Sequence, residues 1–288
     1  MSVKGKSKAI WIQRILLYAA LSIIGLLVMF PFIWMISTAF KVKGYALKFQ
    51  LFPHNLNDLQ TMFTIRNFID VWQGMEFSMY FLNSMFVAGM AAFFATFFAS
   101  LAGYAFAKKD FWAKEKIYYL LLSTMMIPGM MYMIPQFVIV VKLGWYNTYK
   151  AMIIPHLASV FGVLLLRQFI ETIPESLLEA ARIDGASEWQ IFRKVIVPLA
   201  FPVIATLFLM TFLFHWSNFL WQLVVSDPGL TRNIRTLPVG LALFRGPHGN
   251  EWELMMAASC FSILPIAVLF WFAQRFFIEG MTQGAVKE

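Results

Sequence analysis

Six long apolar segments constrain the fold of this chain more than any other feature of its 288-residue sequence. A helix needs about 20 predominantly apolar residues to cross the hydrocarbon core of a bilayer. Six stretches meet this requirement, at residues 13–39, 77–107, 117–141, 151–170, 199–226 and 253–274. Backbone polar groups in lipid must be hydrogen-bonded within the segment, and the alternating pattern of a membrane β-barrel is absent from the sequence. The sequence therefore predicts one all-α polytopic membrane domain, residues 1–288, with six transmembrane helices.

Composition excludes several classes of protein. Hydrophobic residues make up 60% of the chain and charged residues 13%, which is far from the balance of a soluble domain. The net charge of +8 comes from basic residues scattered between the apolar segments, without the basic stripe and interleaved aromatics of a nucleic-acid-binding surface. Anionic lipid headgroups are the expected partner of these residues. The single cysteine, Cys260, can form neither an intrachain disulfide nor a thiolate metal cluster.

The distribution of Lys and Arg predicts the orientation. Loops on the side of the amino terminus contain 14 basic residues and the opposite loops contain 9, over similar lengths. Positively charged loops remain in the cytoplasm, so both termini and residues 171–198 are expected there, in a multi-pass protein of the cytoplasmic (inner) membrane. The first apolar run is about twice as long as the hydrophobic region of a signal peptide, and it contains Pro31 and Trp34. It is therefore expected to be an uncleaved helix.

The apolar segments lack the groups that drive transport in stand-alone carriers. Between the membrane interfaces they contain no Asp, Glu, Lys or Arg, and His215 is the one ionisable residue expected deep in the membrane. Ion-coupled carriers and pumps use buried ionisable relays. The sequence also lacks the GxxxxGKS/T loop that cradles ATP and the HExxH pair of a metalloprotease. Uphill transport by this protein would therefore draw its energy from another subunit.

Charge is concentrated in one cytoplasmic segment, EAARIDGASEWQIFRKVIVP, residues 179–198. Gly185 can adopt the left-handed conformation that ends a helix. Ser187 and Gln190 have the spacing of a capping box, which starts a second helix that Pro198 is expected to close. The sequence thus predicts a helix, a tight turn and a helix.

The surface of this helix-turn-helix permits two interpretations. Trp189 and Phe192 lie three residues apart and form an apolar stripe edged by charged side chains. Such a surface indicates either a lipid interface or a protein partner. Anionic lipid repels acidic residues, so Glu179, Asp184 and Glu188 favour a protein partner.

The same segment resembles the EAA motif, EAA-x3-G-x9-I-x-L-P, of the permease subunits of ATP-binding-cassette (ABC) importers. The matching residues are Glu179-Ala180-Ala181, Gly185 and Val195-Ile196-Val197-Pro198. Further stretches resemble the carbohydrate-uptake branch, and in particular its shorter, MalG-like permease: Asn83-Ser84, Leu143-Gly144-Trp145, Thr148-Tyr149, Ile154-Pro155 and the tail GMTQGAVK. The resemblance covers nearly the whole chain and implies the transmembrane domain of a type I ABC importer.

This resemblance implies that residues 171–198 form a coupling loop that docks in a groove of a cytoplasmic ATPase. The implied coupling residues are Glu179, Ala180, Ala181, Asp184, Gly185, Trp189, Phe192 and Pro198. It also implies a second permease subunit in a heterodimer, a homodimeric or heterodimeric ATPase that binds ATP and Mg, and an extracytoplasmic sugar-binding protein. The chain itself is expected to hold no catalytic residue, cofactor or metal, and so not to be an enzyme.

Two further sites are open to two interpretations each. Aromatic and hydrogen-bonding side chains of the fifth apolar segment suit either a sugar path or helix packing: His215, Trp216, Asn218, Phe219 and Trp221. Residues 227–252 form a long outer loop that is either a solvated connector or, as the resemblance implies, a scoop that enters the binding protein. The implied scoop residues are Leu237, Pro238, Gly240 and Phe244.

The expected function is translocation of a sugar or oligosaccharide delivered by the binding protein. Another solute class, such as a polyol or a glycerol-phosphate-like molecule, remains an alternative, as do a stand-alone secondary carrier and a membrane scaffold without a transport role. The third apolar segment contains Pro128, Gly129 and Pro135, which predict kinks. These kinks suit either a moving gate or a static bend.

Overall fold

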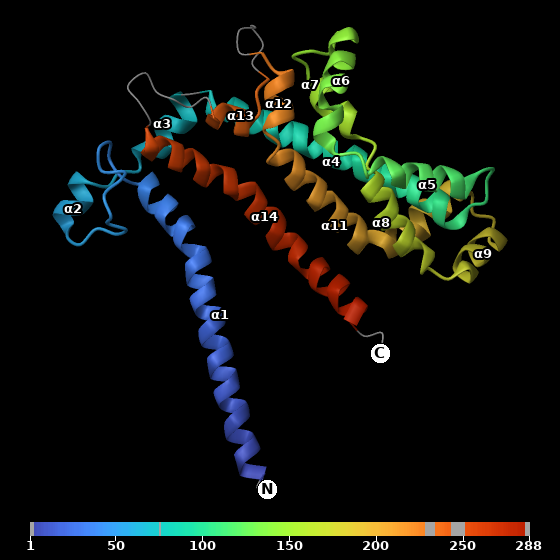
Figure 1. Ribbon diagram of the computed structural model, residues 1–288, viewed down its shortest axis with the longest axis horizontal. Helices are drawn as coiled ribbons and strands as arrows, with labels where there is room; N and C mark the ends of the chain where they lie inside the picture. The colour runs from blue at the N-terminus through green and yellow to red at the C-terminus, as the bar shows by residue number, and fades with distance from the viewer. Residues whose placement is uncertain (1–2, 75, 228–233, 243–250, 286–288) are drawn as a thin grey trace. The chain divides into compact units, whose positions relative to one another are not determined.

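The computed structural model describes residues 3–74, 76–227, 234–242 and 251–285 (Figure 1). Within these ranges the ordered elements are helical, apart from an isolated antiparallel bridge between Lys41 and Phe63. The prediction of an all-α protein is confirmed. The chain divides into two compact units, Met1–Glu76 with Phe244–Ile263, and Phe77–Leu243 with Leu264–Glu288.

The first unit contains α1 (Val3–Ala39), α2 (Leu56–Thr61), α3 (Arg66–Gly74) and the first part of α14 (Trp252–Ala285). The side-chain amide of Asn67 in α3 donates to the carbonyl oxygens of Ala39 (2.8 Å) and Lys41 (2.7 Å) at the end of α1. Phe68 packs edge-on against Phe261 of α14, with 5.7 Å between ring centroids. Polar bonds and aromatic packing thus hold these helices together.

The second unit is organised around α4 (Phe77–Lys108), which packs along α8 and α11. The other elements of this unit are α5 (Lys114–Thr124), α6 (Gly129–Lys142), α7 (Tyr149–Ile153), η1 (Ile154–His156), α8 (Val160–Glu171), α9 (Glu175–Ile183), α10 (Glu188–Ile191), η2 (Phe192–Ile196), α11 (Val197–Trp216), α12 (Leu220–Val225), α13 (Leu237–Ala242) and the rest of α14.

Small residues allow α4 and α8 to approach each other closely. A Cβ atom on Gly103 would lie 2.8 Å from the Cβ of Leu166, and one on Gly162 would lie 2.9 Å from the Cβ of Ala99. In lipid the hydrophobic effect does not drive helices together, so association depends on close van der Waals packing between such residues. The two glycines therefore set the distance between α4 and α8.

Within the described ranges, four helices are long and apolar enough to cross a membrane by themselves: Trp11–Ala39, Phe77–Lys108, Glu188–Trp216 and Trp252–Phe272. The third and fourth predicted segments are instead bent pairs, α5 with α6 at 99° and α7–η1 with α8 at 42°. Counting each pair as one broken span gives the predicted total of six. The prediction of continuous helices at 117–141 and 151–170 is therefore wrong, although the crossings themselves are consistent with the structure.

Proline accounts for both bends. The first break lies after Thr124, and Pro128 has an extended ψ of 131° immediately before α6. Proline lacks the N–H that would continue the hydrogen-bond ladder, and its ring clashes with the preceding turn. The kink predicted around Pro128 and Gly129 is thus confirmed, as a break in the helix, whereas Pro135 lies inside α6 without interrupting it. At the second bend Pro155 lies in η1, and Ser159 restarts the helix by accepting a hydrogen bond from the N–H of Gly162 (3.1 Å).

The fifth span begins earlier and ends earlier than predicted. The helix starts at Glu188 and stops at Trp216, whereas the sequence placed the span at 199–226. Residues Leu220–Val225 form the separate helix α12. Trp221 therefore lies outside α11, on a different element from His215 and Trp216.

Pro198 does not close the helix that begins at Glu188, which corrects the expectation from the sequence. A π-helical turn, Phe192–Ile196, precedes this proline, and the N–H of Val197 bonds the carbonyl oxygen of Phe192 five residues back. Proline ordinarily breaks a helix through its missing N–H and its clash with the carbonyl four residues back. The wider π turn accommodates it, so α10, η2 and α11 form one continuous helix.

Candidate functional site

The helix-turn-helix predicted for the charged segment is present. α9 ends before Gly185, whose φ of +80° is the left-handed conformation that glycine adopts without strain. The hydroxyl of Ser187 accepts from the N–H of Gln190 (3.4 Å), and the side chain of Gln190 accepts from the N–H of Ser187 (2.7 Å). This capping box begins α10.

Apolar side chains attach the helix pair to the rest of the unit. Leu178 of α9, Ile191 of α10 and Ile196 of η2 are fully buried and pack in one cluster with Leu166 of α8. Phe192 is also buried, with its ring 5.7 Å from that of Tyr104 in α4. Phe192, which the resemblance grouped with the partner-facing residues, thus contributes mainly to the internal packing.

A polar cluster around Glu188 fixes the start of α10 to the carboxyl end of α4. The hydroxyl of Tyr104 donates to Glu188 Oε2 at 2.7 Å, and Lys109 forms an ion pair with the same carboxylate. Arg182 of α9 lies 3.4 Å from Glu188 Oε1. We call these four residues the Glu188 cluster. Hydrogen bonds to charged groups are stronger than neutral ones, and here three of them converge on one carboxylate.

Glu175 extends this network to the start of α9. Its carboxylate lies 3.2 Å from Arg182 Nη1 and 3.6 Å from Lys108 Nζ. Lys108 Nζ also donates to the carbonyl oxygen of Ile173 at 2.6 Å. The pKa of Arg182 is raised: desolvation acts to lower it, but the hydrogen bonds and negative charges of Glu175 and Glu188 outweigh that effect. Both helices of the pair are thus bonded to α4.

The remaining acidic side chains of this segment face outward. Glu179 and Asp184 are exposed, and neither has an ion-pair partner among the described residues. Trp189 and Ile183 are 52% and 86% exposed. Next to Asp184 a shallow pocket of about 400 Å³ is lined by both helices. Some charged residues of the segment therefore bond within the chain, whereas Glu179 and Asp184 lie on its outer surface.

Sequence reasoning placed Glu188 on the partner-facing surface and missed its bonds within the chain. Tyr104 and Glu188 are 84 residues apart, and no local pattern connects them. The one sequence signal for this contact was the pair Lys108-Lys109 at the end of an apolar segment. These two cations lie on the same predicted side of the membrane as the acidic loop. That signal indicates proximity only after α4 and α10 are known to pack together.

We predict that Glu188→Gln loosens the helix-turn-helix, because it removes the charge on which Tyr104, Lys109 and Arg182 converge. Amide hydrogen exchange in residues 175–191 of the purified protein should become about threefold faster, which corresponds to ~0.7 kcal/mol, because the carboxylate is half-exposed and water screens its ion pairs. Glu179→Gln is the matched control, since its carboxylate has no ion-pair partner among the described residues. Equal exchange rates in the two variants would contradict the internal role of Glu188.

The aromatic and polar residues of the predicted path separate into different environments. Trp216 is buried and packs against Phe212 and Phe81, each at 5.7 Å between centroids. The indole N–H of Trp221 donates to the carbonyl oxygen of Ala151 at 3.0 Å. Both tryptophans thus make internal packing contacts. Asn218 is half-buried and Phe219 is exposed, in the short connection between α11 and α12.

His215 lines a cavity that the sequence did not predict. Its ring lies 5.2 Å from that of His156, and both residues line a cavity of about 530 Å³. Hydroxyl groups of Tyr132, Ser159 and Thr211 belong to the same lining. His156 Nε2 and His215 Nδ1 are buried without a hydrogen-bond partner among the described residues. The sequence analysis named His215 as the one ionisable residue deep in the membrane and overlooked His156, which lies within the fourth predicted apolar segment, residues 151–170.

The predicted scoop residues lie against the amino end of α4. The N–H of Leu237 donates to Ser84 Oγ at 2.7 Å, and the amide of Asn83 donates to the carbonyl oxygen of Arg235 at 2.9 Å. A Cβ on Gly240 would lie 2.3 Å from Tyr80 Cδ2. Pro238 is half-buried in the same short helix, α13, and Phe244 lies outside the described residues.

Comparison with known proteins identifies the family. Residues 8–282 match the family described as "Binding-protein-dependent transport system inner membrane component". The chain belongs to this family. The match confirms the resemblance to permease subunits of ABC importers that the EAA motif indicated. This permease is thus a transport component of the membrane, and its family is not one of enzymes.

The permease is similar to sugar-transport permeases along nearly its whole length. It is 34% identical over 278 residues to the arabinooligosaccharides transport system permease protein AraQ of Halalkalibacterium halodurans, covering 94% of this chain and 96% of the relative. It is 31% identical over 281 residues to the trehalose/maltose transport system permease protein MalG of Thermococcus litoralis, covering 96% of this chain and 98% of the relative.

Solved structures share the fold of the permease. A chain of a bacterial ABC transporter involved in the import of the acidic polysaccharide alginate matches with a TM-score of 0.79 and 22% identity, over 96% of this chain and 99% of that chain. A chain of the alginate transporter in complex with an alginate pentasaccharide-bound periplasmic protein gives a TM-score of 0.62 and 17% identity, over 94% and 95%. The predicted fold, an ABC-importer transmembrane domain, is confirmed.

Proposed function

We propose that the permease translocates a neutral sugar or oligosaccharide delivered by an extracytoplasmic binding protein. Its similarity to permeases of arabino-oligosaccharide, trehalose/maltose and lactose systems supports this substrate class. The lack of Asp, Glu, Lys and Arg between the interfaces of the apolar segments supports a path for an uncharged solute. The energy for transport is then supplied by a partner subunit.

In the proposed assembly this chain pairs with a second, different permease subunit in the inner membrane. Both termini and the coupling loop, residues 171–198, face the cytoplasm, as the Lys and Arg bias supports. A dimeric ATPase binds ATP and Mg and docks on the coupling loop. This chain contributes the path and the docking surface and binds no cofactor.

The single observation that carries the proposal is the free acidic surface on a helix-turn-helix that is itself bonded to the bundle. Glu179 is exposed, and the adjacent Ala180 and Ala181 have small side chains that allow a partner to approach closely. Complementary charge orients a partner and fixes its register. The bonds from Glu188 and Glu175 to α4 then give the ATPase a rigid point on which to act.

Reversing the charge at Glu179 tests this coupling. We predict that Glu179→Lys lowers sugar uptake per ATP hydrolysed by about tenfold, because a cation there repels the basic residue that the ATPase presents. Gly185→Val should have a similar effect, since a branched side chain at a φ of +80° strains the turn. Uptake and ATP hydrolysis are measured together in proteoliposomes that contain the full assembly.

The matched control is Asp110→Lys, which reverses an exposed acidic charge between α4 and α5, outside the EAA motif. It should leave the ratio of uptake to hydrolysis unchanged. Wild-type ratios in both Glu179→Lys and Gly185→Val would overturn the coupling role. Sugar accumulation by this chain without the ATPase would instead support the alternative of a stand-alone carrier.

The cavity of His156 and His215 is the proposed substrate path within this subunit. Its volume of about 530 Å³ lies in the range of small-molecule sites. Imidazole nitrogens and hydroxyl groups can both donate to and accept from the hydroxyls of a sugar. The cavity also adjoins both helix bends, at Met125–Ile127 and at Pro155.

We predict that His215→Ala lowers the uptake rate by about tenfold while ATP hydrolysis stimulated by the binding protein stays within about twofold, because a lost hydrogen-bonding group affects the path and not the motor. His54→Ala, an exposed position in the loop after α1, is the control. Loss of the assembled complex in His215→Ala would instead assign this residue to helix packing.

α13 is proposed to position the outer loop, residues 227–252, against the binding protein. We predict that Gly240→Ala displaces α13 from Tyr80, because the close approach leaves no room for a methyl group and overpacking costs about 1–3 kcal/mol. Stimulation of ATP hydrolysis by the sugar-loaded binding protein should fall at least threefold, with unstimulated hydrolysis unchanged. Gly89→Ala in α4, where a Cβ meets nothing within 4 Å, should be neutral. Full stimulation of ATP hydrolysis by the binding protein in Gly240→Ala would contradict the proposed role of α13.

A further inference from the structure

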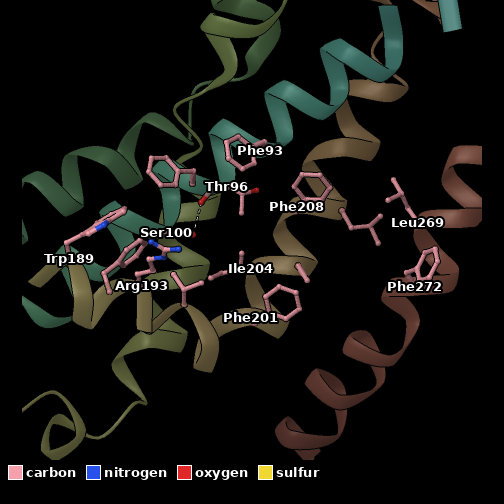
Figure 2. A pocket seen from close by; sticks show the side chains of 15 residues that line it. Phe93, Thr96, Ser100, Trp189, Arg193, Phe201, Ile204, Phe208, Leu269 and Phe272 are labelled. Atoms are coloured by element: carbon pink, nitrogen blue, oxygen red, sulfur yellow. Dashed lines mark hydrogen bonds between the residues drawn. The ribbon is translucent and has the colours of Figure 1, made fainter. Parts of the chain in front are cut away.

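An apolar groove with a single cation lies between α4, α11 and α14 (Figure 2). Its volume is about 550 Å³, and its walls are mainly aromatic and aliphatic. Figure 2 shows Phe93 and Thr96 of α4, Phe201 and Phe208 of α11, and Phe272 of α14 around it. One end is formed by two residues of the coupling loop itself, with the indole of Trp189 and the guanidinium of Arg193. The groove thus has a long apolar part and one basic end.

Arg193 differs from the other arginines near the coupling loop. Arg182 lies within ion-pair distance of Glu175 and Glu188, and Arg167 bonds Glu115 and Glu171. Arg193 has no ion pair or hydrogen bond among the described residues, and its neighbour Lys194 likewise has no ion pair there. The basic end of the groove therefore has a positive charge that the described part of the chain leaves unbalanced.

Two further features mark this site. Thr96 Oγ1 is buried in the wall of the groove without a hydrogen-bond partner among the described residues. Arg193 lies in the π-helical turn Phe192–Ile196, and π turns occur frequently at functional sites. Trp189 beside it is half-exposed, as expected for an indole at a membrane–water interface.

We propose that the groove binds an anionic phospholipid of the cytoplasmic leaflet, with an acyl chain along the phenylalanine walls and the phosphate at Arg193. An acyl chain is the chemistry that suits an apolar groove in a membrane protein. A guanidinium presents several donors in a planar arrangement that matches phosphate oxygens. The assignment of this lipid to the cytoplasmic leaflet rests on the orientation proposed above. Lipid binding in the groove does not itself depend on the transport function.

A competing occupant is an apolar helix of the second permease subunit. Such a helix would fill the walls of the groove but would leave the guanidinium of Arg193 without an anion. A phospholipid satisfies both the apolar walls and the cation. Charge complementarity therefore favours the lipid.

The test is native mass spectrometry of the purified complex after incubation with equal amounts of dioleoyl phosphatidylglycerol and dioleoyl phosphatidylcholine. The wild-type complex should retain phosphatidylglycerol in at least tenfold preference. Arg193→Gln should lose this preference, whereas Lys194→Gln, which removes the neighbouring charge outside the groove lining, should keep it. Ala205→Trp, which fills the groove from α11, should reduce retention of both lipids.

Three results would overturn the proposal. The first is equal retention of the two lipids by the wild-type complex. The second is an unchanged preference in Arg193→Gln. The third is efficient crosslinking of Ala205→Cys to the second permease subunit, which would assign the groove to a subunit contact. Uptake of sugar by the wild-type complex measured in parallel keeps this test separate from that of the transport function.

Discussion

The carboxylate of Glu188 joins the helix-turn-helix to the longest internal helix of the second unit. Tyr104 and Lys109 reach it from the carboxyl end of α4, and Arg182 reaches it from α9. α4 has 32 residues and so extends for about 48 Å. Its other end bonds the α13 segment through Asn83 and Ser84. The proposed docking surface for the ATPase and the segment proposed to meet the binding protein are therefore attached to one helix.

The charged residues of the coupling loop and its surroundings fall into two groups, those with an ion-pair partner within the chain and those without one among the described residues. Where an acid and a base meet, as at Glu175 and Lys108, the pair orders the helix-turn-helix on the bundle. Where a charge has no partner among the described residues, as at Glu179 and Arg193, it lies on an exposed surface or at the end of an apolar groove. Residues in internal ion pairs thus stabilise the structure, whereas residues with unpaired charges are available to bind partners.

Three prolines, Pro128, Pro155 and Pro198, are accommodated in three different ways that the sequence could not distinguish. Pro128 precedes a break of 99°, and Pro155 lies at a bend of 42°. Pro198 lies within a continuous helix, because a π turn accommodates it. The sequence predicts that each proline disturbs the hydrogen-bond ladder. How the disturbance is resolved depends on the neighbouring helices, which no local pattern encodes.

The sequence by itself determined the membrane class, the all-α fold, the approximate apolar segments and the capped helix-turn-helix with its EAA motif. Each of these follows from interactions within one span or a few residues, such as hydrophobic length and the Ser187–Gln190 capping box. Only the tertiary structure decided that Tyr104 bonds Glu188 and that His156 lies beside His215. These contacts join segments far apart in the chain, and their geometry depends on how closely small residues such as Gly103 allow the helices to pack.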